Sequence, residues 1–149
     1  GRSLSVALLD VNVLIALAWP THIHNGAART WFAQRQSDGW ATCPITQCAF
    51  VRLSSNPKLL QPSVETAEAV ALLQRIVALD NHIFWNDAIP FSSPAVPKQL
   101  LVSHRQITDA YLLGLAKHNN GKLVTFDKGI SALLSDASAH KSCLEVIEI

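Results

Sequence analysis

The sequence predicts an α/β fold, a three-layer sandwich in which helices flank a mostly parallel central sheet. Short apolar segments of strand length alternate along the chain with segments of helical periodicity, as in parallel sheets with crossover helices. The chain has 149 residues, of which 49% are hydrophobic, and no repeat, low-complexity tract or linker divides it. We therefore expect a single domain, residues 1–149, built around one core.

The first segments are a strand and two helices. Residues 5–9 are a short apolar run that ends at Asp10, as expected for a buried strand. Residues 13–19 follow as a short helix that ends at Pro20, because proline cannot continue a helix. Residues 24–36 have helical spacing. These segments predict a strand–helix–helix unit at the start of the domain.

The next segments are a second strand and two further helices. Residues 39–43 have the composition of a strand, which Pro44 ends. Residues 46–53 suit a helix that stops at the turn of residues 54–57. Residues 63–79 give the clearest helical pattern of the chain. Its inward stripe is expected to consist of Val70, Leu73, Ile76 and Val77.

The second half of the chain continues the alternation. Residues 82–85 predict a strand, and the Pro- and Ser-rich segment that follows, residues 86–97, predicts a surface loop. A helix over residues 108–118 ends at Asn119-Asn120-Gly121, a common helix stop. The remaining segments are a strand at 122–126, a helical turn at 127–134 and a last strand at 144–147.

Composition excludes several classes of protein. The net charge of +1 gives no overall attraction for nucleic acid, so such binding depends on a local patch. Three cysteines at no metal-binding spacing suit a reducing, cytoplasmic compartment better than a disulfide framework. No apolar run reaches the length of a membrane span. Because the chain lacks Met and begins Gly-Arg-Ser, we expect residues 1–4 to be left over from cloning.

Three acidic residues occupy unusual positions for charged side chains. Asp10 and Asp127 each follow a predicted apolar strand, and Asp109 lies at the start of a predicted helix. In a parallel α/β sheet, the carboxyl ends of the strands and the starts of the following helices share one edge. We therefore expect these three carboxylates to converge there, although they are far apart in the chain.

Two interpretations of these carboxylates remain open. Aspartate is a favoured helix N-cap, and Asp127 before Lys128-Gly129 fits that role well. Carboxylates that lie close together, however, raise each other's pKa values unless a cation lies among them. The natural cation is a hard divalent ion with oxygen ligands, Mg²⁺ or else Mn²⁺. Zinc fits less well, because neither Cys nor His occurs at ligand spacing.

Four segments, in this order along the chain, resemble the PIN-domain family. They are LLDVNVLIALAWP, TQCAFVRLSSNP, HRQITDAYLLGLA and KLVTFDKG. Within that family, the sequence is most similar to the VapC-type toxin ribonucleases of type II toxin–antitoxin systems. The resemblance spans most of the chain and implies a PIN-like sandwich with an acidic, Mg²⁺-binding pocket.

The resemblance also implies an activity, site residues and partners. The activity is that of a Mg²⁺-dependent endoribonuclease that hydrolyses RNA phosphodiester bonds and that a cognate VapB-type antitoxin neutralises. Asp10, Asp109 and Asp127 match the catalytic, metal-binding acids of the family. Asn12 matches the polar residue after the first acid, and Arg52 the arginine after the second motif; both are candidates to support the metal or the substrate. The apolar composition and the resemblance together favour a homodimer.

The sequence departs from the family pattern at Gln47. Many family members carry a further acid there, and the neutral amide removes one negative charge from the pocket. Gln47 either offers its carbonyl oxygen to the site or only hydrogen-bonds to the backbone nearby, so the number of bound ions, one or two, stays open. If Gln47 faces the ion, Gln47→Glu should tighten Mn²⁺ or Mg²⁺ binding. The departure also keeps open a catalytically weak or inactive PIN-fold module that binds RNA or regulates.

Two further points concern the substrate and a rival chemistry. RNA needs positive contacts beside an acidic pocket, and Arg52, Arg105 and Lys128 lie in or next to the motifs. The alternative is that these side chains form ion pairs with the same carboxylates.

An aspartate after a strand also occurs in phosphatases with an aspartyl nucleophile. Those enzymes need a second acid two residues further on, and Asn12 occupies that position.

Overall fold

The computed structural model describes residues 5–60 and 62–149, so the predicted cloning remnant at residues 1–4 lies outside the described residues. Its five-stranded sheet has the order β3-β2-β1-β4-β5, and every neighbouring pair is parallel. The strands are β1 (Ala7–Leu9), β2 (Trp40–Thr42), β3 (His82–Phe84), β4 (Lys122–Thr125) and β5 (Leu144–Val146). The predicted parallel α/β sheet is therefore confirmed.

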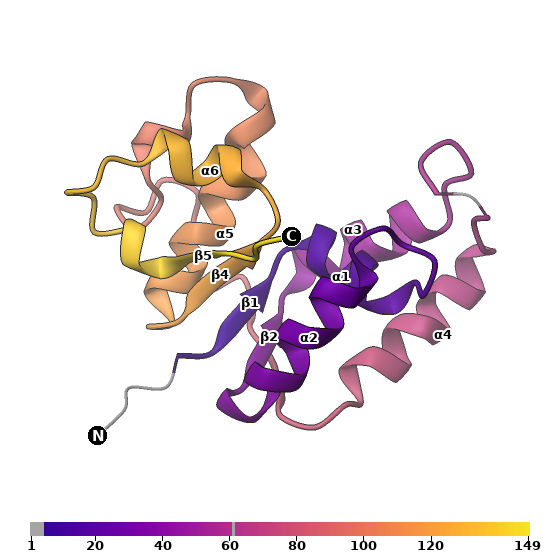
Figure 1. The fold of residues 1–149 in the computed structure, drawn as a ribbon. Coiled ribbons are helices and arrows are strands. Elements are labelled where there is room, and N and C mark those ends of the chain that lie inside the picture. Colours follow the sequence, from indigo (N-terminus) through magenta and orange to yellow (C-terminus); the bar gives the residue numbers. More distant parts are fainter. Residues whose placement is uncertain (1–4, 61) are drawn as a thin grey trace.

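Helices lie on both faces of the sheet and complete the three layers, with α1 to α4 on one side and α5 and α6 on the other (Figure 1). The α-helices are α1 (Val11–Ala18), α2 (Asn25–Arg35), α3 (Pro44–Ser54), α4 (Thr66–Val77), α5 (Ile107–His118) and α6 (Lys128–Leu133). Short 3₁₀ helices are η1 (Gln36–Asp38), η2 (Lys98–Leu100), η3 (His104–Gln106) and η4 (Lys141–Cys143). None of the described helices has the length and apolarity needed to cross a membrane.

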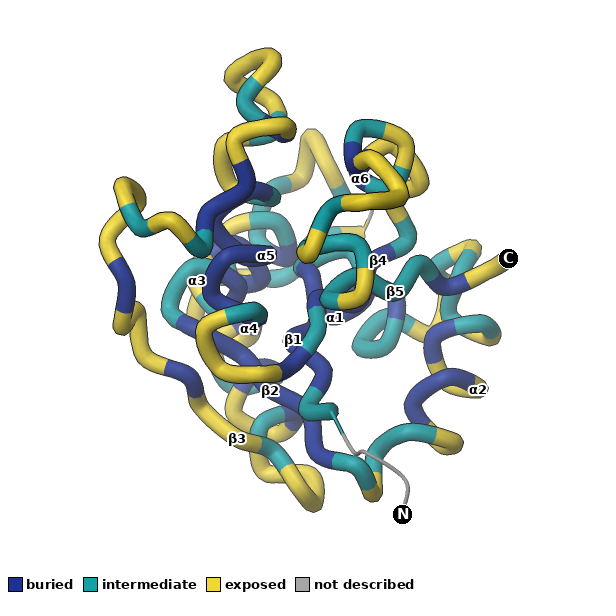
Figure 2. The backbone as a smooth tube through the Cα atoms, turned by 90° about the vertical axis from the view of Figure 1, so that its left-hand side faces the viewer, coloured by how far each residue is buried: buried dark blue, intermediate teal, exposed yellow. Residues whose placement is uncertain are grey.

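The core consists of two apolar clusters, one on each face of the sheet. Leu8 of β1 and Leu123 of β4 belong to the cluster that contains the buried residues of α5. Their neighbours Leu9 and Val124 belong to the cluster formed with α1, α2, α3 and α4. This division follows from strand geometry, which turns successive side chains to opposite faces. Figure 2 shows the result as a buried band through β1, β2 and α5.

The carboxyl ends of the central strands bring two predicted site regions together. β1 pairs with β4 so that Leu9 lies beside Val124, and the backbone N–H of Asp10 donates to the carbonyl of Val124 at 2.9 Å. The next residues along each strand, Asp10 and Thr125, are therefore neighbours at the same edge of the sheet. The sequence segments around residues 10 and 127 meet there.

Details of α3 and α4 differ from the prediction. α3 begins at Pro44 rather than at Thr46, because proline at the first helical position needs no partner for an N–H group. On α4, Val70 is 39% exposed rather than inward. Ala69 is buried instead, in line with Leu73 and Ile76 at helical spacing. Leu73 and Ile76 are buried as predicted and Val77 packs against the same cluster, so only Val70 was placed wrongly.

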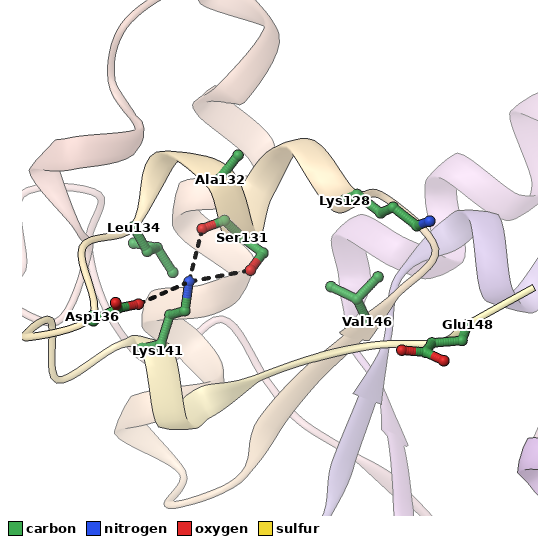
Figure 3. Close-up of a pocket in the computed structure, with 8 residues that line it drawn as sticks. All are labelled: Lys128, Ser131, Ala132, Leu134, Asp136, Lys141, Val146 and Glu148. Atoms are coloured by element: carbon green, nitrogen blue, oxygen red, sulfur yellow. Dashed lines mark hydrogen bonds and ion pairs between the residues drawn. The ribbon is translucent and has the colours of Figure 1, made fainter.

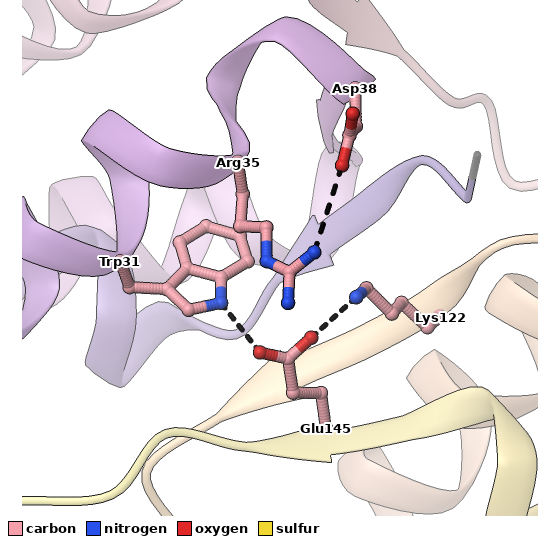
Figure 4. A network of polar contacts seen from close by, with 5 residues as sticks. All are labelled: Trp31, Arg35, Asp38, Lys122 and Glu145. Carbon is pink, nitrogen blue, oxygen red and sulfur yellow. Dashed lines mark hydrogen bonds and ion pairs between the residues drawn. The ribbon is translucent and has the colours of Figure 1, made fainter. Parts of the chain in front are cut away.

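A polar network joins α2 to the edge strand β5 (Figure 4). The indole N–H of Trp31 donates to Glu145 at 2.6 Å, and Lys122 of β4 pairs with the same carboxylate. Burial would raise the pKa of Glu145, but the hydrogen bonds from Lys122 and Trp31 outweigh it and hold that pKa below its usual value. The network fixes β5 against the body of the domain.

Candidate active site

Asp10 is the most buried of the candidate acids. It is 7% exposed and serves as the N-cap of α1, since its Oδ1 accepts from the backbone N–H of Val11 at 2.8 Å. Its Oδ2 accepts from the hydroxyl of Thr125 at 2.8 Å. Burial raises the pKa of Asp10; the two hydrogen bonds act against it, and the charge of Asp127 adds to it. Capping therefore occurs, but it does not remove the cost of this buried charge.

Thr125, the last residue of β4, connects the acidic residues. Its fully buried hydroxyl donates to Asp10 and accepts from the amide Nδ2 of Asn12 at 3.0 Å. The backbone N–H of Asp127 also reaches the same oxygen, at 3.1 Å. Asn12 is held in turn by the backbone N–H of Phe126, which donates to its Oδ1 at 3.2 Å. Asn12 thus orients Thr125, and Thr125 orients Asp10.

Asp109 lies in the first turn of α5, as predicted, and is half-buried. Burial raises its pKa, and the charges of Asp10 and Asp127 raise it further, to about 6. The N-cap of α5 is Gln106, whose side chain makes no capping hydrogen bond. Asp109 is therefore within the electrostatic influence of both other aspartates without capping its helix.

Asp127 is the exposed member of the three. It is the N-cap of α6, because its Oδ1 accepts from the backbone N–H of Gly129 at 2.8 Å. The predicted capping role is confirmed here. A carboxylate oxygen has more than one lone pair, so this cap still leaves acceptor capacity for a cation.

The three carboxylates have no counter-charge of their own. Within residues 5–60 and 62–149, no Lys, Arg or His side chain forms an ion pair with Asp10, Asp109 or Asp127. In the same part of the chain, no group of three Asp, Glu, His or Cys residues is placed so that it could hold a metal ion. The charge of Asp127 thus raises the pKa of both Asp10 and Asp109, and side-chain movement is required before all three aspartates share one cation.

Gln47 is turned toward β2. Its Nε2 donates to the hydroxyl of Thr42 at 2.9 Å, and that hydroxyl lies 2.7 Å from Nε2 of His82. Of the two interpretations of Gln47, this contact favours the hydrogen-bonding one, with a side chain rather than the backbone as partner. Gln47 and the exposed Arg52 also line a cavity of about 420 Å³ between α3 and α4.

Comparison with known proteins identifies the family of this chain. Residues 7–134 match the PIN domain, which covers most of the chain. The chain belongs to the PIN-domain family. Its relatives within this family include VapC proteins of Mycobacterium tuberculosis. It is 48% identical to Ribonuclease VapC39 over 134 residues, which cover 89% of this chain and 94% of that protein. It is 46% identical to Ribonuclease VapC38, over 86% of this chain and 89% of that protein.

Solved structures have the same fold at low sequence identity. The VapBC2 complex of Rickettsia felis, crystallised with a DNA fragment from its promoter, aligns with a TM-score of 0.60 at 12% identity. That alignment covers 96% of this chain and 99% of that chain. The sarcin–ricin loop cleaving toxin VapC20 of M. tuberculosis aligns with a TM-score of 0.59 at 16% identity, over 85% of this chain and 93% of that chain. This PIN-domain protein is thus a VapC-type member in sequence and in fold.

The sequence analysis of this PIN domain missed the role of Thr125. The residue stands inside the quoted segment KLVTFDKG, two positions before Asp127, but its motif alone does not reveal its partners. The available signal was strand alternation: a hydroxyl at the end of an apolar strand, on the face of the buried Leu123, needs a polar partner. Its neighbour across the sheet, Asp10, supplies that partner.

Proposed function

We propose that this VapC-type protein is the toxin of a toxin–antitoxin pair and hydrolyses RNA phosphodiester bonds with a divalent cation held by Asp10, Asp109 and Asp127. The observation that supports the proposal most strongly is the group of three carboxylates at one sheet edge, without a paired cation among the described residues. Such a group is costly unless a cation neutralises it.

The donor set fits Mg²⁺, with Mn²⁺ as a substitute. All three candidate ligands are carboxylates, which hard divalent cations prefer, and in the described structure they must move to share one ion. A cation bound there supplies an activated water and stabilises charge on the phosphate during displacement. Cleavage by water leaves a 5′-phosphate and a 3′-hydroxyl on the fragments.

Asp10, Asp109 and Asn12 have different roles in the proposed site. Asp10 is fixed from two sides by Val11 and Thr125, so one ligand is pre-oriented. Asp109 is half-buried, and burial with the charges of Asp10 and Asp127 raises its pKa to about 6, so a bound cation favours its ionised form. Asn12 cannot protonate a leaving group, because a carboxamide is not an acid; here it hydrogen-bonds to Thr125 and Phe126. The aspartyl-phosphatase chemistry is therefore disfavoured.

Its partners are RNA, a VapB-type antitoxin and a second copy of the chain, and its place of action is the cytoplasm. The relatives named VapC and the VapBC2 complex of R. felis support the antitoxin. The free cysteines Cys43, Cys48 and Cys143 suit a reducing compartment. Exposed apolar side chains on β3, Ile83 and Phe84 at 40% and 52% exposure, support a homodimer.

A cleavage assay tests the proposal. Purified protein, free of antitoxin, is incubated with total bacterial RNA in Mg²⁺, in Mn²⁺ and in EDTA, and the 5′ ends of the fragments are sequenced. Wild type should give discrete 5′-phosphorylated ends with either metal and none in EDTA. Asp10→Asn should lose at least about a hundredfold of the rate.

The matched control is Asp80→Asn, because Asp80 is exposed and lies before the amino end of β3, whereas the three acids lie at the carboxyl edge of the sheet. This variant should cleave RNA like wild type. If wild type binds RNA but cuts none with either metal, the protein is instead the RNA-binding or regulatory module of the same fold that Gln47 keeps open.

A further inference from the structure

A groove lies along α6, the helix that Asp127 caps. It has a volume of about 530 Å³ and lies between α6 and the end of the chain beyond β5 (Figure 3). Its near end is Lys128, which directly follows Asp127. Its apolar lining includes Leu134 and Val146, and its far end is Lys141. One end of the groove is thus formed by the residue next in the chain to a candidate metal ligand.

Lys141 is a cation held in place. Its Nζ donates to the backbone oxygen of Ser131 at 3.0 Å and to the hydroxyl of Ser131 at 3.2 Å, as Figure 3 shows. An ammonium group has three N–H donors, and beyond these two bonds Nζ forms an ion pair with the exposed carboxylate of Asp136 at 3.8 Å. The side chain is 35% exposed and lines the groove. Because the ion pair with Asp136 is exposed and therefore weak, a phosphate oxygen can take the place of that carboxylate on the fixed ammonium.

Lys128 supplies a second positive charge at the near end. Its side chain is exposed, and it forms no ion pair within residues 5–60 and 62–149. The alternative that Lys128 neutralises the aspartates therefore does not apply to the described structure. Between the two lysines lie apolar side chains that offer a surface for a flat base.

Two acids, Asp136 and Glu148, also line the groove, and their charge is opposite to that of the lysines. Asp136 is fully exposed and 3.8 Å from the Nζ of Lys141, so solvent screens most of its effect. Glu148 is exposed near the mouth of the groove, where Lys128 also lies. A carboxylate there repels an incoming phosphate, whereas the lysines attract it.

We propose that the groove between α6 and the end of β5 binds the RNA nucleotide next to the cleavage position, with its phosphates on Lys128 and Lys141 and its base on the apolar lining. This inference rests on the proposed ribonuclease function and names a binding subsite for the same substrate. Because Lys128 at one end of the groove directly follows Asp127, an RNA strand whose phosphate lies at the three acids has the groove as a neighbouring surface. The carboxylate of Glu148, at the end of the groove near Lys128, repels phosphate and so lowers the affinity for RNA.

Binding of a short RNA without cleavage tests the groove. The probe is a fluorescein-labelled, single-stranded RNA of random sequence, and fluorescence anisotropy in EDTA gives its affinity between about 50 and 200 mM salt. Lys128→Gln and Lys141→Gln should each weaken binding several-fold and reduce the salt slope by about 0.7, as expected for one lost phosphate contact on a single strand. Glu148→Gln should tighten binding.

The control variants separate charge from folding. Lys58→Gln removes an exposed lysine in the loop after α3, outside the groove, and should bind RNA like wild type. Lys141→Arg keeps the charge and should retain most of the affinity. If Lys141→Gln lowers the melting temperature, its weaker binding no longer tests the subsite. Lys128→Gln and Glu148→Gln then test it, because the first should weaken RNA binding and the second should tighten it.

The outcomes distinguish this subsite from the proposed function. If wild type cleaves RNA with Mn²⁺ while both lysine variants bind the probe like Lys58→Gln, the subsite is wrong and the function stands. The same holds if Glu148→Gln weakens binding. If the variants shift binding as expected but no metal supports cleavage, the function is wrong and the groove remains an RNA site.

Discussion

At the scale of single residues, Asp10 explains why a lone carboxylate stands in an apolar segment. It caps α1 and also lies within reach of the charge of Asp127, so capping and the acidic site are not alternatives here. The positions of the three aspartates were predictable, because strand ends and helix starts share one edge of a parallel sheet. The contacts of Thr125 and Gln47 were not, because they depend on side-chain directions across neighbouring strands.

The raised pKa of Asp109 predicts how stability changes with pH in the absence of metal. Its folded-state value is about 6 against an ordinary 3.8, so the folded protein holds this proton more tightly than the unfolded chain. The free energy of unfolding should therefore fall as pH rises from about 4 to about 6. Thermal melts in EDTA across this range should show wild type losing stability relative to Asp109→Asn, and Mn²⁺ at pH 7 should restore wild type alone.

Asp136→Asn is the matched control for this pH dependence, since its carboxylate is fully exposed and should not alter the profile. A difference in melting temperature between wild type and Asp109→Asn that stays constant from pH 4 to pH 7 would contradict the electrostatic account of Asp109.

Thr125 should govern how well Asp10 binds a cation. Thr125→Val removes the hydroxyl donor and leaves Asp10, Asn12 and the N–H of Asp127 without their shared partner. We expect a loss of about 1–3 kcal/mol in the free energy of unfolding in EDTA. Mn²⁺ affinity measured by calorimetry should fall about 10-fold or more. Thr125→Ser keeps the hydroxyl and should resemble wild type; equal defects in both variants would refute the role of this group.

Gln47→Glu separates the two interpretations of that position. In the structure the amide donates to Thr42, and no described contact joins it to the aspartates. An ionised carboxylate cannot donate, so the Thr42 hydroxyl would donate to the new side chain. Nε2 of His82 would then donate to the Thr42 oxygen. This arrangement favours the protonated imidazole and raises the pKa of His82 from its burial-lowered value. NMR titration of His82 should show this rise, while Mn²⁺ affinity stays near that of wild type. A clearly tighter Mn²⁺ affinity would show that residue 47 faces the ion.

At the scale of elements, the hydrophobic pattern located every strand and α-helix of the sheet sandwich, but not their limits. α3 starts at Pro44 and α4 at Thr66, because proline and the local capping geometry, rather than apolar spacing, determine where helices begin. Val70 was placed inward because valine is apolar, but Ala69 fills the close helix contact instead. Packing volume between helices is a tertiary property that a single sequence does not display.

The start of β4 depends on a glycine for its close packing. A Cβ at Gly121 would lie 2.5 Å from the carbonyl oxygen of Val6 and 2.6 Å from the ring of Trp85. Gly121→Ala should therefore reduce the free energy of unfolding by about 1–3 kcal/mol in chemical denaturation. Gly26→Ala, on α2 with no atom within 4 Å of its Cβ, is the control and should stabilise by about 0.5 kcal/mol. Similar stability of both variants would contradict this packing.

At the scale of the whole molecule, the sheet topology assembles the site from distant parts of the chain. β1 and β4 are neighbours at the centre of the sheet and bring Asp10 beside the segment of Asp127, while α5 adds Asp109 from one face. The other face carries α3 with Gln47 and Arg52. From the sequence, we expected only that the strand ends and helix starts share one edge of the sheet. The order of the strands, with β1 and β4 adjacent near its centre, is known from the structure alone.

The most direct test of the central claim is anomalous X-ray diffraction from crystals of this protein soaked in Mn²⁺. The account predicts a Mn²⁺ peak bonded to carboxylate oxygens of Asp10, Asp109 and Asp127, at about 2.0–2.3 Å, after a shift of side chains from the metal-free arrangement. A peak that excludes any of the three aspartates, or none at this edge of the sheet at saturating Mn²⁺, would contradict it.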